Sequence, residues 1–253
     1  MLTRDELAEV ARLKRLTLKN AERDYLQELL LFSLYAGVGR ELAFKGGTCL
    51  YKLHGLNRFS EDLDFTLVRP IDLDEVMRET VRRLRFFGVS GQVKEAKKHA
   101  KEMNFGILLR GPLFTGDRAS LCFIPVNVSL REGIALDPER VTLRSLYREI
   151  PGFEVFSMTV KEMLAEKVRA IFARGKPRDL YDLWFFLRRG VRLDPSLINR
   201  KLRLYRMRFD AEKFARCVEA MGKRWEVDLK NLVVGSPPSF EEVKAEVIGS
   251  LGG

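Results

Sequence analysis

Two aspartates one residue apart in an apolar run constrain this sequence more than any other feature. Asp62 and Asp64 alternate with Leu63 and Phe65 in a strand-like pattern, so both carboxylates should project from one face while the apolar side chains enter the core. Like charges held side by side repel each other, and a divalent cation relieves that repulsion. Because Mg²⁺ prefers carboxylate oxygens that leave room for substrate phosphates, the pattern predicts a metal site on this strand.

A glycine pair precedes these aspartates. Gly46 and Gly47 separate a short strand-like run, 42–44, from a helix-like run, 47–54. At such a turn, backbone N–H groups can approach a triphosphate, and the dipole of the following helix adds attraction. Taken alone, a glycine pair is usually a turn, and Asp-x-Asp is usually a solvated strand face or a strand-end cap. The two motifs in this order favour a nucleotide-triphosphate site, because the phosphates need both parts close together.

Strand-like and helix-like runs are mixed up to about residue 156. Helices are predicted over 3–16, 20–37 and 72–87, and further strands over 63–68, 89–97, 103–110 and 121–130. Only helical patterns follow, from residue 160 and over 178–189, 195–209 and 211–222. We therefore predict an α/β (α+β) fold with a mixed-sheet domain and N-terminal helices over residues 1–156, followed by an all-helical C-terminal lobe over residues 157–253.

Charge and cysteine content narrow the class of protein. The chain carries 45 Lys and Arg against 35 Asp and Glu, a net charge of +10, so it should attract a polyanion. Its three cysteines are far apart and fit neither a disulfide framework nor a metal-binding spacing. No apolar run reaches the length of a membrane span, and no secretory signal opens the chain, so we expect a cytoplasmic protein with no membrane partner.

Two blocks of the sequence resemble a known family. Lys45-Gly46-Gly47-Thr48 and Arg58-Phe59-Ser60-x-Asp62-Leu63-Asp64-Phe65 are similar to the signature of the AbiEii/AbiGii toxin family, a branch of the polymerase-β-like nucleotidyltransferases. The stretches Glu166–Ala170 and Arg178–Leu183 are similar to that family's second block. The resemblance spans about residues 44–187.

The resemblance implies a polymerase-β-like mixed sheet and roles for particular residues. The metal ligands, for Mg²⁺ or Mn²⁺, would be Asp62 and Asp64. The residues that contact the phosphates of an NTP substrate would be Gly46, Gly47 and Ser60. The site would be completed by Lys167 and Asp179. The other candidate nucleotide-binding residues are Lys45, Thr48, Asp182 and Asn127.

The second block can also be interpreted from its residues alone. Lys167 falls within an apolar helical stripe, where it either extends past its neighbours to water or faces a cleft and neutralises a triphosphate. Asp179 and Asp182 lie three apart on the next helix and flank its apolar stripe. They are either a charged helix start, which the helix dipole favours, or site residues, with Asp182 holding Arg178 or Lys167 in place.

One residue departs from the pattern of polymerase-β-like enzymes, which usually carry a third carboxylate on a later strand. On strand 121–130 that position is Asn127, which offers a neutral carbonyl oxygen but no negative charge. Three outcomes follow. The enzyme uses one tightly held metal, another carboxylate such as Asp179 becomes the base, or the chain binds nucleotide without efficient transfer.

A basic segment lies near the end of the chain. Eight basic residues and one acidic residue occur from Arg188 to Arg208, and Arg200, Arg203 and Arg206 should remain free to meet RNA. A solvated helix face or the docking site of an acidic partner explains the segment equally well. The resemblance implies a toxin that transfers a nucleoside monophosphate to an acceptor such as the tRNA 3′ end and is countered by an antitoxin. The alternatives are a small-molecule or protein acceptor, or a degenerate nucleotide- or RNA-binding module.

Overall fold

The computed structural model describes residues 1–131 and 133–250, without the side chains of residues 95–98. The chain divides into two compact units. Unit 1 consists of Met1–His54, Ser60–Ile134 and Pro138–Ser157, and unit 2 of Gly55–Phe59, Ala135–Asp137 and Met158–Gly253. Two short segments that precede residue 157 thus belong to the same unit as the C-terminal helices, whereas the sequence predicted a division at a single point.

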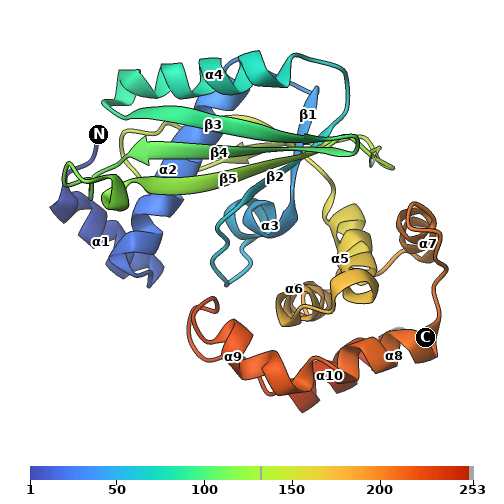
Figure 1. The fold of residues 1–253 in the computed structure, drawn as a ribbon. Coiled ribbons are helices and arrows are strands. Elements are labelled where there is room, and N and C mark those ends of the chain that lie inside the picture. Colours follow the sequence, from blue (N-terminus) through green and yellow to red (C-terminus); the bar gives the residue numbers. More distant parts are fainter. Residues whose placement is uncertain (132, 251–253) are drawn as a thin grey trace. The chain divides into compact units, whose positions relative to one another are not determined.

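Unit 1 is built on a seven-stranded mixed sheet within the described part of the chain, with strand order β3-β4-β5-β2-β1-β7-β6 (Figure 1). Its strands are β1 (Leu42–Lys45), β2 (Leu63–Leu67), β3 (Ser90–His99), β4 (Glu102–Arg110), β5 (Cys122–Ser129), β6 (Glu139–Leu143) and β7 (Phe153–Ser157). β1 pairs parallel with β7, β2 pairs parallel with β5, and the other neighbours are antiparallel. The predicted mixed α/β class is confirmed. Two strands of the sheet, β6 and β7, were not predicted from the sequence.

Helices cover the sheet of unit 1. They are α1 (Arg4–Lys14), α2 (Leu18–Tyr35), α3 (Gly46–His54) and α4 (Leu73–Arg83), with short 3₁₀ turns at Leu84–Phe87 and Arg118–Ser120. The predicted capping box begins α1, because Thr3 accepts from the Glu6 N–H while the Glu6 side chain accepts from the Thr3 N–H. α4 runs along β3, and α3 packs against β1 and β2 (Figure 1). The start of α3 is thereby fixed beside the two strands that carry the candidate site.

A buried charge cluster joins the first three helices. Lys52 Nζ lies 2.7 Å from Asp24 Oδ1 and 3.2 Å from Glu28 Oε1, and Lys14 pairs with the same two carboxylates. The Tyr147 hydroxyl donates to Asp24 Oδ2 at 2.7 Å. Burial alone raises the pKa of Asp24, but the attraction of Lys52 and Lys14 outweighs it and lowers this pKa to about 2. Two cations balance two anions, so the cluster holds the helices together without a net buried charge.

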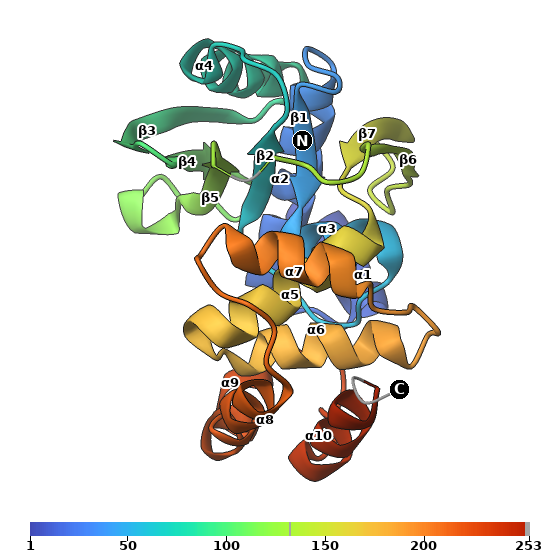
Figure 2. The same ribbon diagram turned by 90° about the vertical axis from the view of Figure 1, so that its right-hand side faces the viewer.

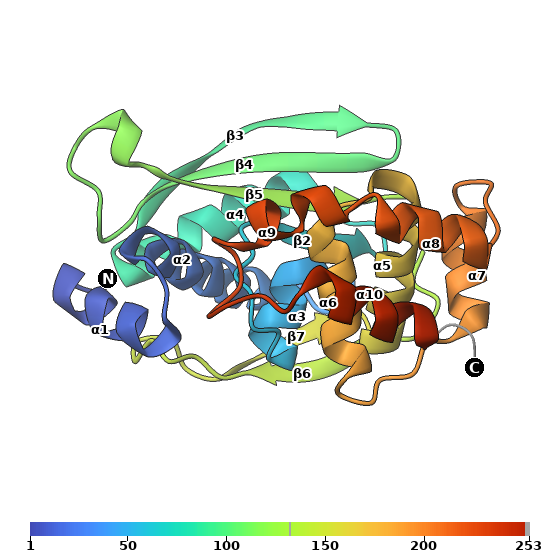
Figure 3. The ribbon, with the colours of Figure 1, turned by 90° about the horizontal axis from the view of Figure 1, so that it is seen from below.

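Unit 2 consists mainly of helices. They are α5 (Val160–Arg174), α6 (Pro177–Leu187), α7 (Pro195–Arg203), α8 (Ala211–Glu219), α9 (Trp225–Leu229) and α10 (Phe240–Gly249), with a 3₁₀ turn at Gly222–Arg224. α5 packs against α6, α7 and α8 (Figure 2), and α6 packs against α9 and α10 (Figure 3). The helix predicted to continue to residue 209 ends at Arg203, because Arg206 adopts a left-handed backbone with φ 57°, which a right-handed helix cannot include.

Candidate nucleotide- and metal-binding site

Three predicted polar residues lie in one row across the sheet. In the strand register Lys45 of β1 stands opposite Asp64 of β2, which stands beside Asn127 of β5. Residues opposite one another on neighbouring strands share a face of the sheet, so the three side chains are neighbours. Asn127 Nδ2 donates a hydrogen bond to Asp64 Oδ1 at 3.0 Å. The strand pairing therefore brings together a cation, a carboxylate and an amide that are far apart in the sequence.

Position 46 requires a glycine because the Asp64 carboxylate lies close to its backbone. Its φ of +80° is one that L side chains rarely adopt, and a Cβ added to it would stand 2.5 Å from Asp64 Oδ2. The Asp64 carboxylate thus lies against the backbone that begins α3. The two motifs singled out in the sequence are in direct contact.

The start of α3 also supports Asp62. Thr48 is fully buried, and its hydroxyl donates to the main-chain oxygen of Asp62 at 2.5 Å. Gly47 is buried in the same first turn, whose N–H groups have no partner within the helix. Thr48 therefore fixes the backbone of one candidate metal ligand from the helix that carries the glycines.

Asp62 directly precedes β2. Asp62 and Asp64 alternate with buried apolar residues, as predicted. Leu63 and Phe65 are fully buried, whereas Asp62 and Asp64 are partly exposed. Ser60, also partly exposed, lies in the preceding loop, where Gln27 Nε2 donates to its main-chain oxygen at 3.1 Å. The loop that carries the phosphate-contacting candidate is thus tied to α2.

The oxygen donors of unit 1 fit a hard cation that takes only a few of its ligands from the protein. Asp62 and Asp64 offer carboxylate oxygens, and Asn127 presents its amide N–H to Asp64, where sequence reasoning considered its carbonyl oxygen. In the part of the chain described, no group of three or more His, Cys, Asp or Glu side chains could hold a metal ion. Such a pair suits Mg²⁺, which usually takes one or two carboxylates and completes its shell with phosphates and water.

The second block forms a buried charge network within unit 2. Lys167 Nζ lies 3.1 Å from Asp179 Oδ1 and 2.7 Å from Asp182 Oδ2. Arg174 forks onto Asp179 with two contacts of 2.8 Å. Arg58 forks onto Asp182 at 2.5 and 2.7 Å. Lys167 does not extend to water: it is 7% exposed and lies between two aspartates.

Asp179 is held in its ionised form. Burial raises its pKa, but Lys167 and Arg174 outweigh that effect and hold the pKa well below its usual range. A carboxylate stabilised in this way is a weak proton acceptor. The geometry therefore favours Asp179 as a partner for Lys167 over Asp179 as a general base.

Comparison with known proteins identifies the family. The family model described as nucleotidyl transferase AbiEii toxin of type IV toxin–antitoxin systems matches residues 29–246. The chain belongs to the AbiEii family. The resemblance seen in the sequence is thereby confirmed, and it extends beyond residues 44–187 at both ends.

Solved structures share the fold of this AbiEii protein. MenT4, a nucleotidyltransferase toxin from Mycobacterium tuberculosis, is 24% identical with a TM-score of 0.70, and the alignment covers 99% of this chain and 88% of that one. JHP933 from Helicobacter pylori is 18% identical with a TM-score of 0.62 and coverages of 93% and 91%. No curated protein matches the chain with significance. At these identities the similarity shows that the chain shares its fold with these proteins.

Sequence reasoning missed two members of the unit 2 network, Arg174, which pairs with Asp179, and Arg58, which pairs with Asp182. Asp182 was considered as a partner for Arg178 or Lys167; it pairs with Lys167 and also with Arg58, which is 124 residues away in sequence. One sign in the sequence that Arg58 belongs to the site is that it lies in the same motif as Ser60. A partner so distant in sequence leaves no local periodicity to detect.

The basic segment of the AbiEii chain divides into exposed and buried residues. Arg200, Arg203 and Arg206 are exposed. Lys201 is buried, with its Nζ 2.6 Å from Glu162 Oε1 and 2.9 Å from Glu166 Oε1. Three arginines are therefore available to a ligand, whereas the lysine among them belongs to the interior of unit 2.

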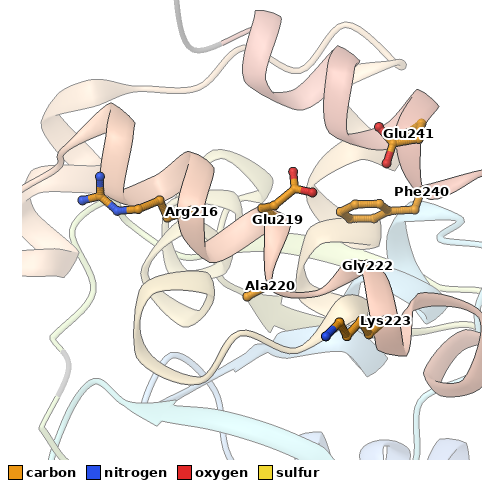
Figure 4. Close-up of a pocket in the computed structure, with 7 residues that line it drawn as sticks. All are labelled: Arg216, Glu219, Ala220, Gly222, Lys223, Phe240 and Glu241. Carbon is orange, nitrogen blue, oxygen red and sulfur yellow. The ribbon is translucent and has the colours of Figure 1, made fainter.

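A cavity of about 730 Å³ opens elsewhere in unit 2, between the ends of α8 and α10 (Figure 4). It is lined by Arg216, Glu219, Ala220, Gly222, Lys223, Phe240 and Glu241. None of the predicted site residues lines it. No helix among the residues described is both long and apolar enough to cross a bilayer.

Proposed function

We propose that this AbiEii protein transfers a nucleoside monophosphate from an NTP to a hydroxyl of an RNA acceptor. In this reaction the acceptor oxygen bonds to the α-phosphorus, the bond to the β-phosphate oxygen breaks, pyrophosphate leaves, and the hydroxyl proton passes to solvent or a base. The observation that carries the proposal is the contact between the two motifs, with Asp64 Oδ2 lying against Gly46 at the start of α3. A metal-binding carboxylate and a phosphate-binding turn are neighbours in such a site.

The residues of unit 1 supply binding and orientation. Asp62 and Asp64 would hold the cation, and the N–H groups at Gly46 and Gly47 would bind phosphate oxygens. The hydrogen bond from Asn127 stabilises the Asp64 carboxylate and orients it through Oδ1. Mg²⁺, or Mn²⁺ in its place, would neutralise charge on the triphosphate when bound. Because nucleotidyl transfer depends mainly on positioning and charge neutralisation, two carboxylates suffice for one metal.

Residues of unit 2 contribute positive charge. Arg58, Lys167 and Arg174 surround Asp179 and Asp182, so three cations meet two anions and the network keeps a positive excess. The Lys167 ammonium group is a compact charge of the kind that binds phosphates. We assign it to charge neutralisation and Asp179 to orienting it, since a strongly ionised carboxylate is a poor base.

The acceptor is proposed to be RNA, such as a tRNA 3′ end. The net charge of +10 and the exposed Arg200, Arg203 and Arg206 support it, because backbone phosphates bind exposed arginines. Family membership supports an antitoxin partner that counters this activity.

The test is transfer of label from each of the four α-labelled NTPs to total tRNA with Mg²⁺ or Mn²⁺. The natural chain should label tRNA with one or more NTPs, and Asp62→Ala should abolish the label. Asp117→Ala is the matched control, because Asp117 is an exposed carboxylate of the same unit. Label that persists in Asp62→Ala would refute the assignment of the metal site.

A degenerate nucleotide-binding module is the second candidate. Asn127 in place of a third carboxylate favours it, since an amide cannot act as a metal-binding anion or a base. That function predicts nucleotide binding that depends on Asp62, with no label on tRNA, on a small acceptor or on protein.

A further inference from the structure

The segment Gly55–Phe59 is built into unit 2, although it immediately precedes the candidate metal strand. Its main chain pairs with residues 232–234: Arg58 forms a β-bridge with Val233, and the Phe59 N–H donates to the Leu232 oxygen at 2.8 Å. The segment is thus held within unit 2 by main-chain hydrogen bonds.

A buried ion pair fixes the same segment through its side chain. Arg58 is 2% exposed and Asp182 is fully buried, and the guanidinium forks onto the carboxylate at 2.5 and 2.7 Å. Two-pronged charge-assisted pairs are strong and specific in geometry. Removing one partner leaves an uncompensated buried charge, so the pair is costly to break.

One carboxylate therefore pairs with two cations of unit 2, Arg58 and Lys167. Asp182 Oδ2 also lies 2.7 Å from Lys167 Nζ. On the other side of Arg58 the chain continues through Ser60, whose main-chain oxygen is held by Gln27 of unit 1, to Asp62. Phe59 is held by Leu232 of unit 2 and Ser60 by Gln27 of unit 1, so the contacts of Arg58 and Phe59 are one of the two anchors of the segment that leads into Asp62.

We propose that Asp182 is a positioning residue, whose carboxylate orients the Lys167 ammonium and, through Arg58, the segment that leads into Asp62 and Asp64. The inference rests on the proposed function, because it assigns Asp62, Asp64 and Lys167 to the reaction. Displacement of a reacting group by about 1 Å can lower a rate about 10²-fold, so a residue that touches neither metal nor nucleotide is able to control transfer.

The experiment compares Asp182→Asn with Glu162→Gln. Both remove a carboxylate that is fully buried in unit 2 and paired with a lysine, but Glu162 pairs with Lys201 and has no contact with Arg58. Hydrogen exchange of peptides covering residues 60–64 reports local opening of this segment without requiring activity. Asp182→Asn should speed exchange in these peptides about tenfold and raise the Mg²⁺ concentration for half-maximal transfer. Glu162→Gln should change neither quantity, although both variants lose stability.

Equal exchange over residues 60–64 in the natural chain and in Asp182→Asn would overturn the inference, as would an equal rise in Glu162→Gln. If Asp182→Asn does not fold, Arg58→Lys gives the same comparison, because it keeps the charge and loses the two-pronged contact. If the natural chain transfers no nucleotide, the proposed function fails, and the exchange comparison still decides whether Asp182 holds the segment.

Discussion

Replacement of Gly46 by alanine tests the contact between the two motifs. The left-handed backbone, at φ +80°, costs an L residue about 1–2 kcal/mol. The new Cβ would also stand 2.5 Å from Asp64 Oδ2, closer than real Cβ atoms approach other atoms, and 3.0 Å from the Asp64 Cβ. The carboxylate must move, and loss of its hydrogen bond from Asn127 adds about 1 kcal/mol. We expect Gly46→Ala to lower the free energy of unfolding by about 2–3 kcal/mol and transfer by about 10²-fold.

Gly116→Ala is the matched control. Gly116 also belongs to unit 1 and also has a positive φ, +100°, but a Cβ there would meet nothing within 4 Å. It should lose about 1–2 kcal/mol for the backbone alone and keep the natural transfer rate.

Denaturant unfolding followed by circular dichroism measures the stability of both variants, and label transfer at saturating Mg²⁺ measures activity. The reasoning is refuted if Gly46→Ala and Gly116→Ala transfer at the same rate, because the Asp64 carboxylate would then tolerate displacement or play no part in the reaction.

Three further predictions follow from buried and site residues. Asn127→Asp places a second carboxylate beside Asp64, so calorimetry should show tighter Mn²⁺ binding than in the natural chain; unchanged affinity would mean that the row does not hold the metal. Because the pKa of Asp24, about 2, lies below its unfolded value of about 3.9, this residue stabilises the fold by about 2 kcal/mol above pH ~4, and that stability is lost as the pH falls toward 2. Acid unfolding of Asp24→Asn should lack that component, and an identical pH dependence would contradict it. Lys201→Met leaves Glu162 buried without its cation and should cost about 3–5 kcal/mol in denaturant unfolding. The exposed neighbour Arg200→Met should cost under about 0.5 kcal/mol, and equal losses would contradict the pairing.

Local patterns predicted the parts of the fold that local physics determines. Alternation of apolar residues located β2 and β5, and the Thr3 capping box located α1. β6 escaped because it is a largely exposed edge strand that carries charged side chains, and β7 escaped because only Val155 and Ser157 of its five residues are buried. The end of α7 escaped because its left-handed turn is made by Arg206, where glycine or asparagine would have marked it.

For the candidate site, the sequence identified residue types but not their partners. The row Lys45, Asp64 and Asn127 depends on strand register, and register depends on the pairing of strands that are distant in the chain. Sequence reasoning placed Asn127 on the expected strand but could not show that its amide N–H faces Asp64. The Arg58 pair was missed for the same reason, since nothing near Arg58 signals a carboxylate 124 residues later.

The distance between Arg58 and Asp182 also has a consequence during synthesis. At about 5–20 residues per second, the ribosome delivers Asp182 roughly 6–25 s after Arg58. Throughout that interval the Arg58 guanidinium lacks the Asp182 carboxylate that neutralises it in the interior. The segment before Asp62 therefore cannot reach its final position. The growing chain completes its sheet first and acquires an ordered aspartate loop only with the helices that follow. We therefore expect the loop before Asp62 to become ordered in a nascent chain only after most of unit 2 has been translated.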